Sequence, residues 1–133
     1  MKKDFINKEI WMLTFGASFQ RAYAYVDNAS NDTKVLFKNN TTVVVENILA
    51  QYKSAKVTDA QHIDNIKAVS DSSKQYAEIF NGGKINFGIA QKMLNLYLKY
   101  QWCLGNIKEP PHFPVDRIIQ QKLNEQAKLK GLP

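Results

Sequence analysis

The chain has 133 residues and a formal net charge of +6, and its length predicts one domain spanning residues 1–133. Its 44% hydrophobic and 23% charged residues are typical of a folded protein and argue against disorder. No run of about 18 apolar residues predicts a membrane span, and the N-terminus lacks a signal-peptide pattern. Cys103 is the single cysteine, which excludes an internal disulfide and a thiolate zinc site. We therefore expect a cytoplasmic protein with no membrane partner.

Most of the positive charge lies toward the C-terminal end. Residues 84–133 hold eight basic and three acidic residues, whereas residues 1–83 are close to neutral. This asymmetry favours a polyanionic partner, with nucleic acid ahead of anionic lipid. The alternative is a solvated basic face that only aids solubility, and charge alone does not separate the two.

Apolar residues spaced three and four apart predict a series of helices separated by short breaks. The first is expected over about residues 7–26, and the second begins near Asp32, a candidate N-cap. Residues 41–45 would also suit a short strand, but the helical spacing continues past them. Thr58 and Gln61 have the spacing of a capping box and open a third helix. The later helices are expected over about 76–80, 88–104 and 114–130, with Asn81-Gly82-Gly83 as a turn.

These segments predict an all-α fold, built as a compact orthogonal bundle of five to six helices. No internal repeat and no long Pro- or Gly-rich linker divides the chain. The basic C-terminal third, residues 84–133, is expected to belong to the same single domain. Residues 131–133 are expected to form a short flexible tail.

Residues 88–104 form the strongest helical pattern, and they carry two stripes. The apolar stripe consists of Ala90, Met93, Leu94, Tyr97, Tyr100 and Leu104. Lys92, Asn95 and Lys99 share another face, because they stand three and seven positions apart. This polar stripe is either the solvated face of an amphipathic helix or part of a site. Cys103, near the helix end, is expected to be a small buried apolar residue.

A proline-rich loop precedes the last predicted helix. Residues 110–114 are stiff, because each proline fixes its own φ and restrains its predecessor. The loop would bring Asp116 to the first turn of that helix, either as a plain cap or as a carboxylate aimed at the Lys92 stripe. His112 lies in the loop as a further polar candidate, but it has no partner at metal-ligand spacing. We therefore expect no metal and no cofactor.

Two short segments resemble the helix-hairpin-helix DNA glycosylases. They read Gly88-Ile89-Ala90-Gln91-Lys92-Met93-Leu94 and Phe113-Pro114-Val115-Asp116. The resemblance implies that Lys92 is a Schiff-base nucleophile and that Asp116 is the carboxylate assisting it. It also implies that the backbone around Gly88 holds a DNA phosphate. Ala90 and Leu94 stand where the family usually has glycine and alanine.

Together these features predict a small helical nucleic-acid-binding protein with DNA as its partner. The expected phosphate contacts are Gly88, Lys99, Arg117 and Lys122. Lys92 and Asp116 are the hypothesis for a glycosylase- or lyase-like site, and whether the protein is an enzyme stays open. Asn95 and His112 are further polar candidates for that site. The alternative is a non-enzymatic module that binds another protein through the loop from Pro110 to Val115.

Overall fold

The computed structural model describes residues 2–19, 23–54 and 56–109, and every structural statement below concerns these residues. Their regular structure is helical: α1 (Lys2–Phe19), α2 (Asn31–Ser54), α3 (Asp59–Ser72), the 3₁₀ helix η1 (Ser73–Ile79) and α4 (Phe87–Cys103). The predicted all-α fold is confirmed for this part of the chain, including a helix rather than a strand at residues 41–45. None of these helices combines the length and apolar character that a bilayer crossing requires. The helix predicted over 114–130 and the tail at 131–133 lie outside the described residues.

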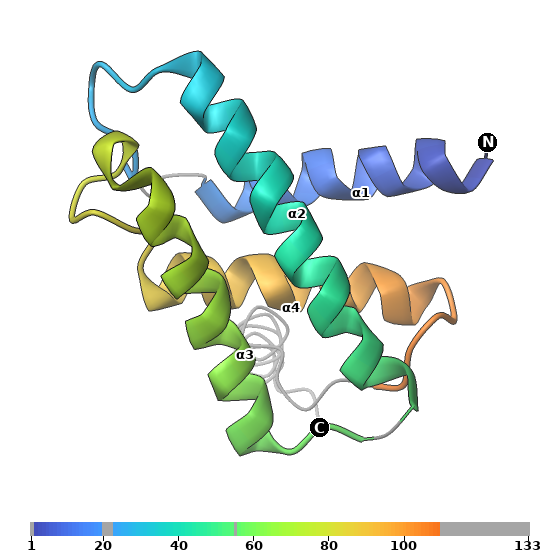
Figure 1. Ribbon diagram of the computed structural model, residues 1–133. Helices are drawn as coiled ribbons and strands as arrows, with labels where there is room; N and C mark the ends of the chain where they lie inside the picture. Colours follow the sequence, from blue (N-terminus) through green and yellow to red (C-terminus); the bar gives the residue numbers. More distant parts are fainter. Residues whose placement is uncertain (1, 20–22, 55, 110–133) are drawn as a thin grey trace, which may run out of the picture.

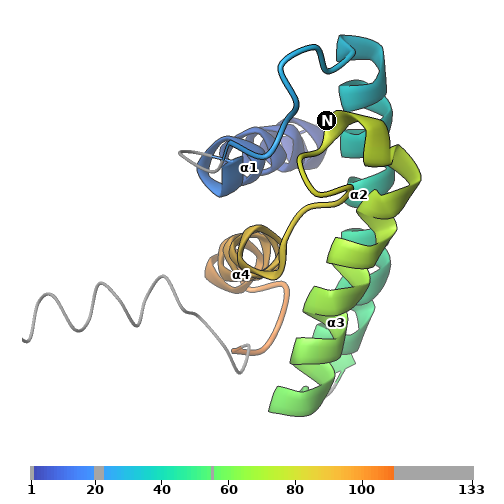
Figure 2. The same cartoon turned by 90° about the vertical axis from the view of Figure 1, so that its left-hand side faces the viewer.

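The α-helices are arranged in two crossing layers. α1 and α4 run antiparallel and pack against each other, while α2 and α3 form a second pair (Figure 1). In Figure 2, α1 and α4 are seen nearly end-on beside the upright α2 and α3. Contacts between α3 and α4 join the layers. The apolar core therefore lies where the two pairs of helices meet.

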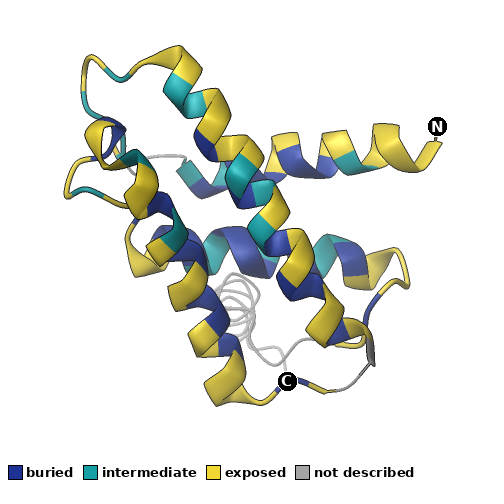
Figure 3. Ribbon diagram, viewed as in Figure 1, coloured by how far each residue is buried: buried dark blue, intermediate teal, exposed yellow. Residues whose placement is uncertain are grey.

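Aromatic side chains make up much of this core. Phe37 of α2 is fully buried. Its ring meets four others edge-on at centroid distances of 4.8–6.2 Å, those of Phe15, Phe19, Tyr76 and Phe80. Trp11 of α1 stacks on Tyr97 of α4 at 4.4 Å. Such ring pairs contribute beyond the area they bury, and Figure 3 shows buried positions recurring along each helix.

Side-chain hydrogen bonds fix the starts of α3 and α4. Thr58 Oγ1 accepts the Gln61 N–H at 3.2 Å, and Gln61 Oε1 accepts the Thr58 N–H at 3.0 Å. This confirms the capping box predicted from the sequence. At α4, Asn86 Oδ1 accepts the N–H of Ile89 at 2.8 Å.

The start of α2 differs by two residues from the prediction. Ser30 occupies the capping position instead of Asp32, since its Oγ accepts the N–H of Thr33 at 3.4 Å. Asp32 lies in the first turn of the helix. An acidic side chain is favourable there as well, because it faces the positive end of the helix dipole.

The first helix is shifted toward the N-terminus relative to the prediction, covering residues 2–19 instead of 7–26. Residues 24–26 run alongside residues 79–81 instead. The Val26 N–H donates to the Ile79 carbonyl at 2.9 Å, and the Asn81 N–H donates to the Ala24 carbonyl at 2.8 Å. The apolar residues before α2 therefore reach the core from a non-helical segment, which helical periodicity does not reveal.

The short helix predicted over 76–80 is a 3₁₀ helix, η1, with non-helical backbone angles at Tyr76 (φ −117°, ψ 35°). The chain then turns through Gly82 and Gly83, whose φ values of 84° and 81° lie in the region that favours glycine. This turn leads the chain from η1 into α4.

The end of α4 corrects two further predictions. Cys103 is exposed, not buried. Gln101 is buried, and a step of two residues turns about 200° around a helix, so Cys103 faces away from the core. Leu104 was expected in the apolar stripe but is 50% exposed, because it lies beyond the last residue of the helix.

Candidate functional site

A buried polar network crosses the middle of the molecule. It joins Tyr52 of α2, His62 of α3 and Asn95 of α4, each at most 2% exposed. The Tyr52 hydroxyl lies 2.6 Å from His62 Nδ1, and His62 Nε2 lies 2.7 Å from Asn95 Oδ1. Three helices are therefore connected through one imidazole ring.

The neighbouring Asn65 adds two hydrogen bonds to this network. Its Nδ2 donates to the Tyr52 hydroxyl at 2.9 Å and to Gln51 Oε1 at 3.1 Å. Asn95 Oδ1 can only accept, so the ring proton sits on His62 Nε2, and Nδ1 accepts from the Tyr52 O–H. Burial raises the pKa of Tyr52, although the hydrogen bond from Asn65 lowers it. The network ties the helices together, while burial favours the neutral phenol.

The polar stripe predicted on α4 is only partly solvated. Asn95 is buried at its centre, with its Nδ2 unpartnered among the described residues. Lys92 and Lys99 lie one turn to either side and are half-buried. The structure thus assigns Asn95 to the helix packing that centres on His62, and not to a solvated face.

Gly88 lies exposed in the first turn of α4. The side chain of Asn86 caps this turn, and residues 88–98 continue without interruption in the same helix. The remaining predicted site residues lie outside the described part of the chain: His112, Asp116, Arg117, Lys122 and the loop from Pro110 to Val115. The pairing of Lys92 with Asp116 therefore stays a prediction.

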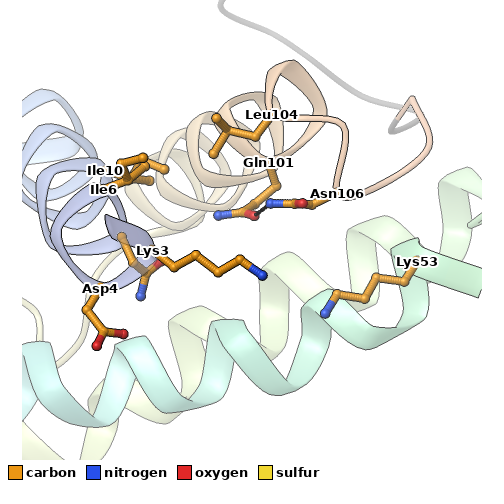
Figure 4. Close-up of a pocket in the computed structure, with 9 residues that line it drawn as sticks. Lys3, Asp4, Ile6, Ile10, Lys53, Gln101, Leu104 and Asn106 are labelled. Atoms are coloured by element: carbon orange, nitrogen blue, oxygen red, sulfur yellow. Dashed lines mark hydrogen bonds between the residues drawn. The ribbon is translucent and has the colours of Figure 1, made fainter. Parts of the chain in front are cut away.

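A hollow of about 510 Å³, here called the basic hollow, lies between the start of α1 and the end of α4. Its lining is Lys3, Asp4, Ile6, Asn7, Ile10, Lys53, Gln101, Leu104 and Asn106. Figure 4 shows the ammonium groups of Lys3 and Lys53 extending into the same space from α1 and α2, while the Asp4 carboxylate points away. The sequence separates these two lysines by fifty positions and links them by no motif, so they were not among the predicted site residues.

The amide side chains of the basic hollow are held in place. Asn106 Nδ2 donates to Gln101 Oε1 at 2.9 Å, and this hydrogen bond is drawn in Figure 4. The Gln101 amide nitrogen is turned toward the α1 side of the hollow. On the opposite wall, Asn7 Nδ2 donates to Glu46 Oε1 at 3.2 Å. The hollow therefore combines two cations with ordered amide groups.

The two lysines of the basic hollow form no ion pair within the described residues, although Asp4 also lines the hollow. Within the described part of the chain, ion pairs form between Lys74 and Asp71 at 3.2 Å and between Lys84 and Asp71 at 3.9 Å. Neither Lys3 nor Lys53 takes part in one. An ammonium group without a carboxylate partner keeps its three N–H donors available to an anion.

Comparisons with known proteins found no matching family model, no matching curated protein and no matching solved structure. Among the described residues, no group of three or more His, Cys, Asp or Glu side chains is placed to hold a metal ion. The chemistry of the basic hollow is therefore argued from its own side chains.

Proposed function

We propose that the protein binds nucleic acid through the sugar–phosphate backbone, with the basic hollow as one phosphate contact. One observation carries the proposal: the ammonium groups of Lys3 and Lys53, which form no ion pair with another described residue, converge over a hollow that is partly lined with amides. Backbone contacts carry little sequence information. We therefore expect binding that tolerates many sequences.

The composition of the basic hollow suits a phosphate group. Phosphate oxygens accept charge-assisted hydrogen bonds from lysine, and these are stronger than bonds between neutral groups. The Gln101 amide nitrogen adds a neutral donor on the α4 side. At about 510 Å³ the hollow falls within the usual size of ligand sites, about 300–1,000 Å³.

The charge of the whole chain favours a polyanion over a single phosphate. A net charge of +6 exceeds what one phosphate neutralises, and residues 84–133 hold most of the excess. Clustered lysines and arginines raise the rate and strength of association with nucleic acids through their summed field. The predicted contacts Gly88, Lys99, Arg117 and Lys122 remain part of this proposal as further phosphate ligands.

The test measures binding of short fluorescent DNA and RNA strands, single and double, by anisotropy between about 50 and 200 mM salt. We expect the logarithm of the association constant to fall linearly with the logarithm of salt concentration. The double variant Lys3→Gln/Lys53→Gln should reduce that slope on duplex DNA by about 0.9, since the hollow makes one phosphate contact and each contact contributes about 0.9.

The matched control is Lys67→Gln/Lys74→Gln, which removes the same charge from exposed positions outside the basic hollow. This control should weaken binding slightly, and it should reduce the slope of the salt dependence by less than Lys3→Gln/Lys53→Gln does. Binding that does not depend on salt, or equal effects of the two double variants, would overturn the proposal.

A further inference from the structure

A second hollow, of about 360 Å³, runs along the other half of α1. This aromatic groove is lined by Trp11, Met12, Phe15, Gly16, Phe19, Tyr25 and Lys38. The residues from α1 span two helical turns, or about 12 Å at 1.5 Å per residue. The groove is therefore long enough for a short alkyl chain or one aromatic ring system.

Stacked neighbours already occupy ring faces of Trp11, Phe19 and Tyr25. Trp11 stacks on Tyr97 at 4.4 Å, outside the groove lining. Tyr25 stacks on Phe19 at 5.2 Å and on Phe80 at 5.5 Å. A stacked nucleobase needs a free ring face, whereas an apolar tail packs equally well against ring edges. The geometry therefore favours an apolar tail over a base.

Met12 and Gly16 keep the groove open toward solvent. Met12 is 67% exposed, and its flexible thioether side chain adapts to irregular apolar shapes. A Cβ added at Gly16 would meet no atom within 4 Å. The absence of a side chain at this position leaves the space above α1 empty.

Two cations lie beside the groove on α2. The Lys38 ammonium is 5.7 Å from the centre of the Phe15 ring, and the Lys34 ammonium is 4.4 Å from that of Tyr25. Cation–π contacts of this kind hold the charges near the rings. Neither lysine forms an ion pair within the described residues, and the groove lining contains no carboxylate. Apolar walls thus adjoin uncompensated positive charge.

From this combination we infer that the aromatic groove binds a small amphiphilic anion. Its apolar tail lies along α1 between Met12 and Phe19, and its carboxylate, sulfonate or phosphate head meets Lys34 and Lys38. The volume of about 360 Å³ is at the small end of ligand sites, which fits a single short tail. The inference is independent of nucleic-acid binding, because the two hollows share no lining residue.

The test uses decanoate, with decanol and decylammonium as neutral and cationic counterparts of the same tail. Trp102→Phe leaves Trp11 as the one tryptophan, so its fluorescence reports on the groove. Decanoate should change this signal saturably, and decylammonium should bind at least about ten-fold more weakly because of the two lysines. Equal affinity for decanoate and decylammonium would overturn the inference.

Two variants in the Trp102→Phe background localise the binding. Gly16→Leu should abolish it by filling the groove, and leucine favours a helix by about 1 kcal/mol over glycine, so the fold should persist. Its control, Ala68→Leu, adds similar bulk at an exposed position of α3. Lys34→Gln/Lys38→Gln should lower the affinity for decanoate on the order of ten-fold and leave the affinity for decanol unchanged. Decanoate binding that survives Gly16→Leu in a protein with unchanged circular dichroism would place the ligand elsewhere.

Discussion

The imidazole of His62 is fully buried, and each of its ring nitrogens lies within hydrogen-bond distance of a side chain from a different helix. A buried polar group without a partner costs about 1–3 kcal/mol. The network therefore stabilises the native packing and penalises arrangements that separate Tyr52 or Asn95 from the ring. Asn95 Nδ2 has no hydrogen-bond partner among the residues that the structure describes, so the network is not fully satisfied by them at the α4 end.

Replacing Tyr52 by phenylalanine tests the network. Tyr52→Phe keeps the ring but removes the donor to His62 Nδ1 and an acceptor of Asn65 Nδ2. We expect the free energy of unfolding to fall by about 2 kcal/mol, because buried polar atoms lose their partner. Urea denaturation followed by circular dichroism measures this change.

Tyr100→Phe is the matched control for that experiment. Tyr100 is half-buried on α4, and its hydroxyl forms no hydrogen bond with the described residues. Its loss should change the free energy of unfolding by less than about 0.5 kcal/mol. A Tyr52→Phe effect no larger than that of the control would show that the network does not stabilise the fold.

At the scale of the element, the start of α3 depends on a reciprocal pair of short hydrogen bonds between Thr58 and Gln61. Both residues are exposed, so their contribution is separable from core packing. Thr58→Ala should lower the free energy of unfolding by about 1 kcal/mol, as expected for loss of an N-cap hydroxyl. Thr58→Ser keeps the hydroxyl and should stay close to the native chain in thermal unfolding. If Thr58→Ala and Thr58→Ser unfold at the same temperature, the capping role is refuted.

Local signals explain which elements the sequence predicts well. The capping box at Thr58, the glycine turn at residues 82–83 and the apolar spacing of α4 each depend on neighbours within a few positions. The shifted ends of α1 have a different cause. Residues 24–26 form backbone hydrogen bonds with residues 79–81, and no local sequence pattern predicts that pairing. Helical periodicity alone therefore extends the first helix too far.

The candidate site was harder to predict than the fold for the same reason. Lys3 and Lys53 come together through the packing of three helices, and neither belongs to a motif. Asn95 shares a face with Lys92 and Lys99, so its spacing predicts either a solvated stripe or part of a site. The structure buries it because His62 of α3 packs against that turn of α4. Long-range packing decides both cases.

At the scale of the whole molecule, the joining of the two helix layers keeps several tyrosines from ionising. Burial raises the pKa of Tyr97 to about 12, and the Glu46 carboxylate adds to the rise. Burial also raises the pKa of Tyr52 and of Tyr25. In the unfolded chain these phenols ionise near pH 10. For Tyr97, the contribution to stability is therefore complete below about pH 10 and is lost as the pH rises toward 12.

Alkaline denaturation tests this account. Between about pH 10 and 12, the raised pKa of Tyr97 should lower the free energy of unfolding by up to about 1.4 kcal/mol per pH unit. Tyr97→Phe should make the free energy of unfolding fall less steeply with pH, because the contribution of this tyrosine is removed. Tyr23→Phe, at an exposed position, should leave the fall unchanged. Urea midpoints measured at several alkaline pH values give the comparison. An identical decline in both variants would contradict the assignment to Tyr97.

The pairing of α1 with α4 has a consequence for how the chain is made. α1 ends at Phe19, while its neighbour in the layer begins at Phe87. A ribosome adds about 5–20 residues per second, so several seconds pass between the synthesis of α1 and that of α4. During this time the apolar side of α1 cannot pack against α4. Closing so large a loop is also entropically costly, and the local α2–α3 hairpin can form earlier. During synthesis the nascent chain thus passes through a stage in which Trp11 lacks its α4 partner Tyr97, when a chaperone has its best opportunity to bind.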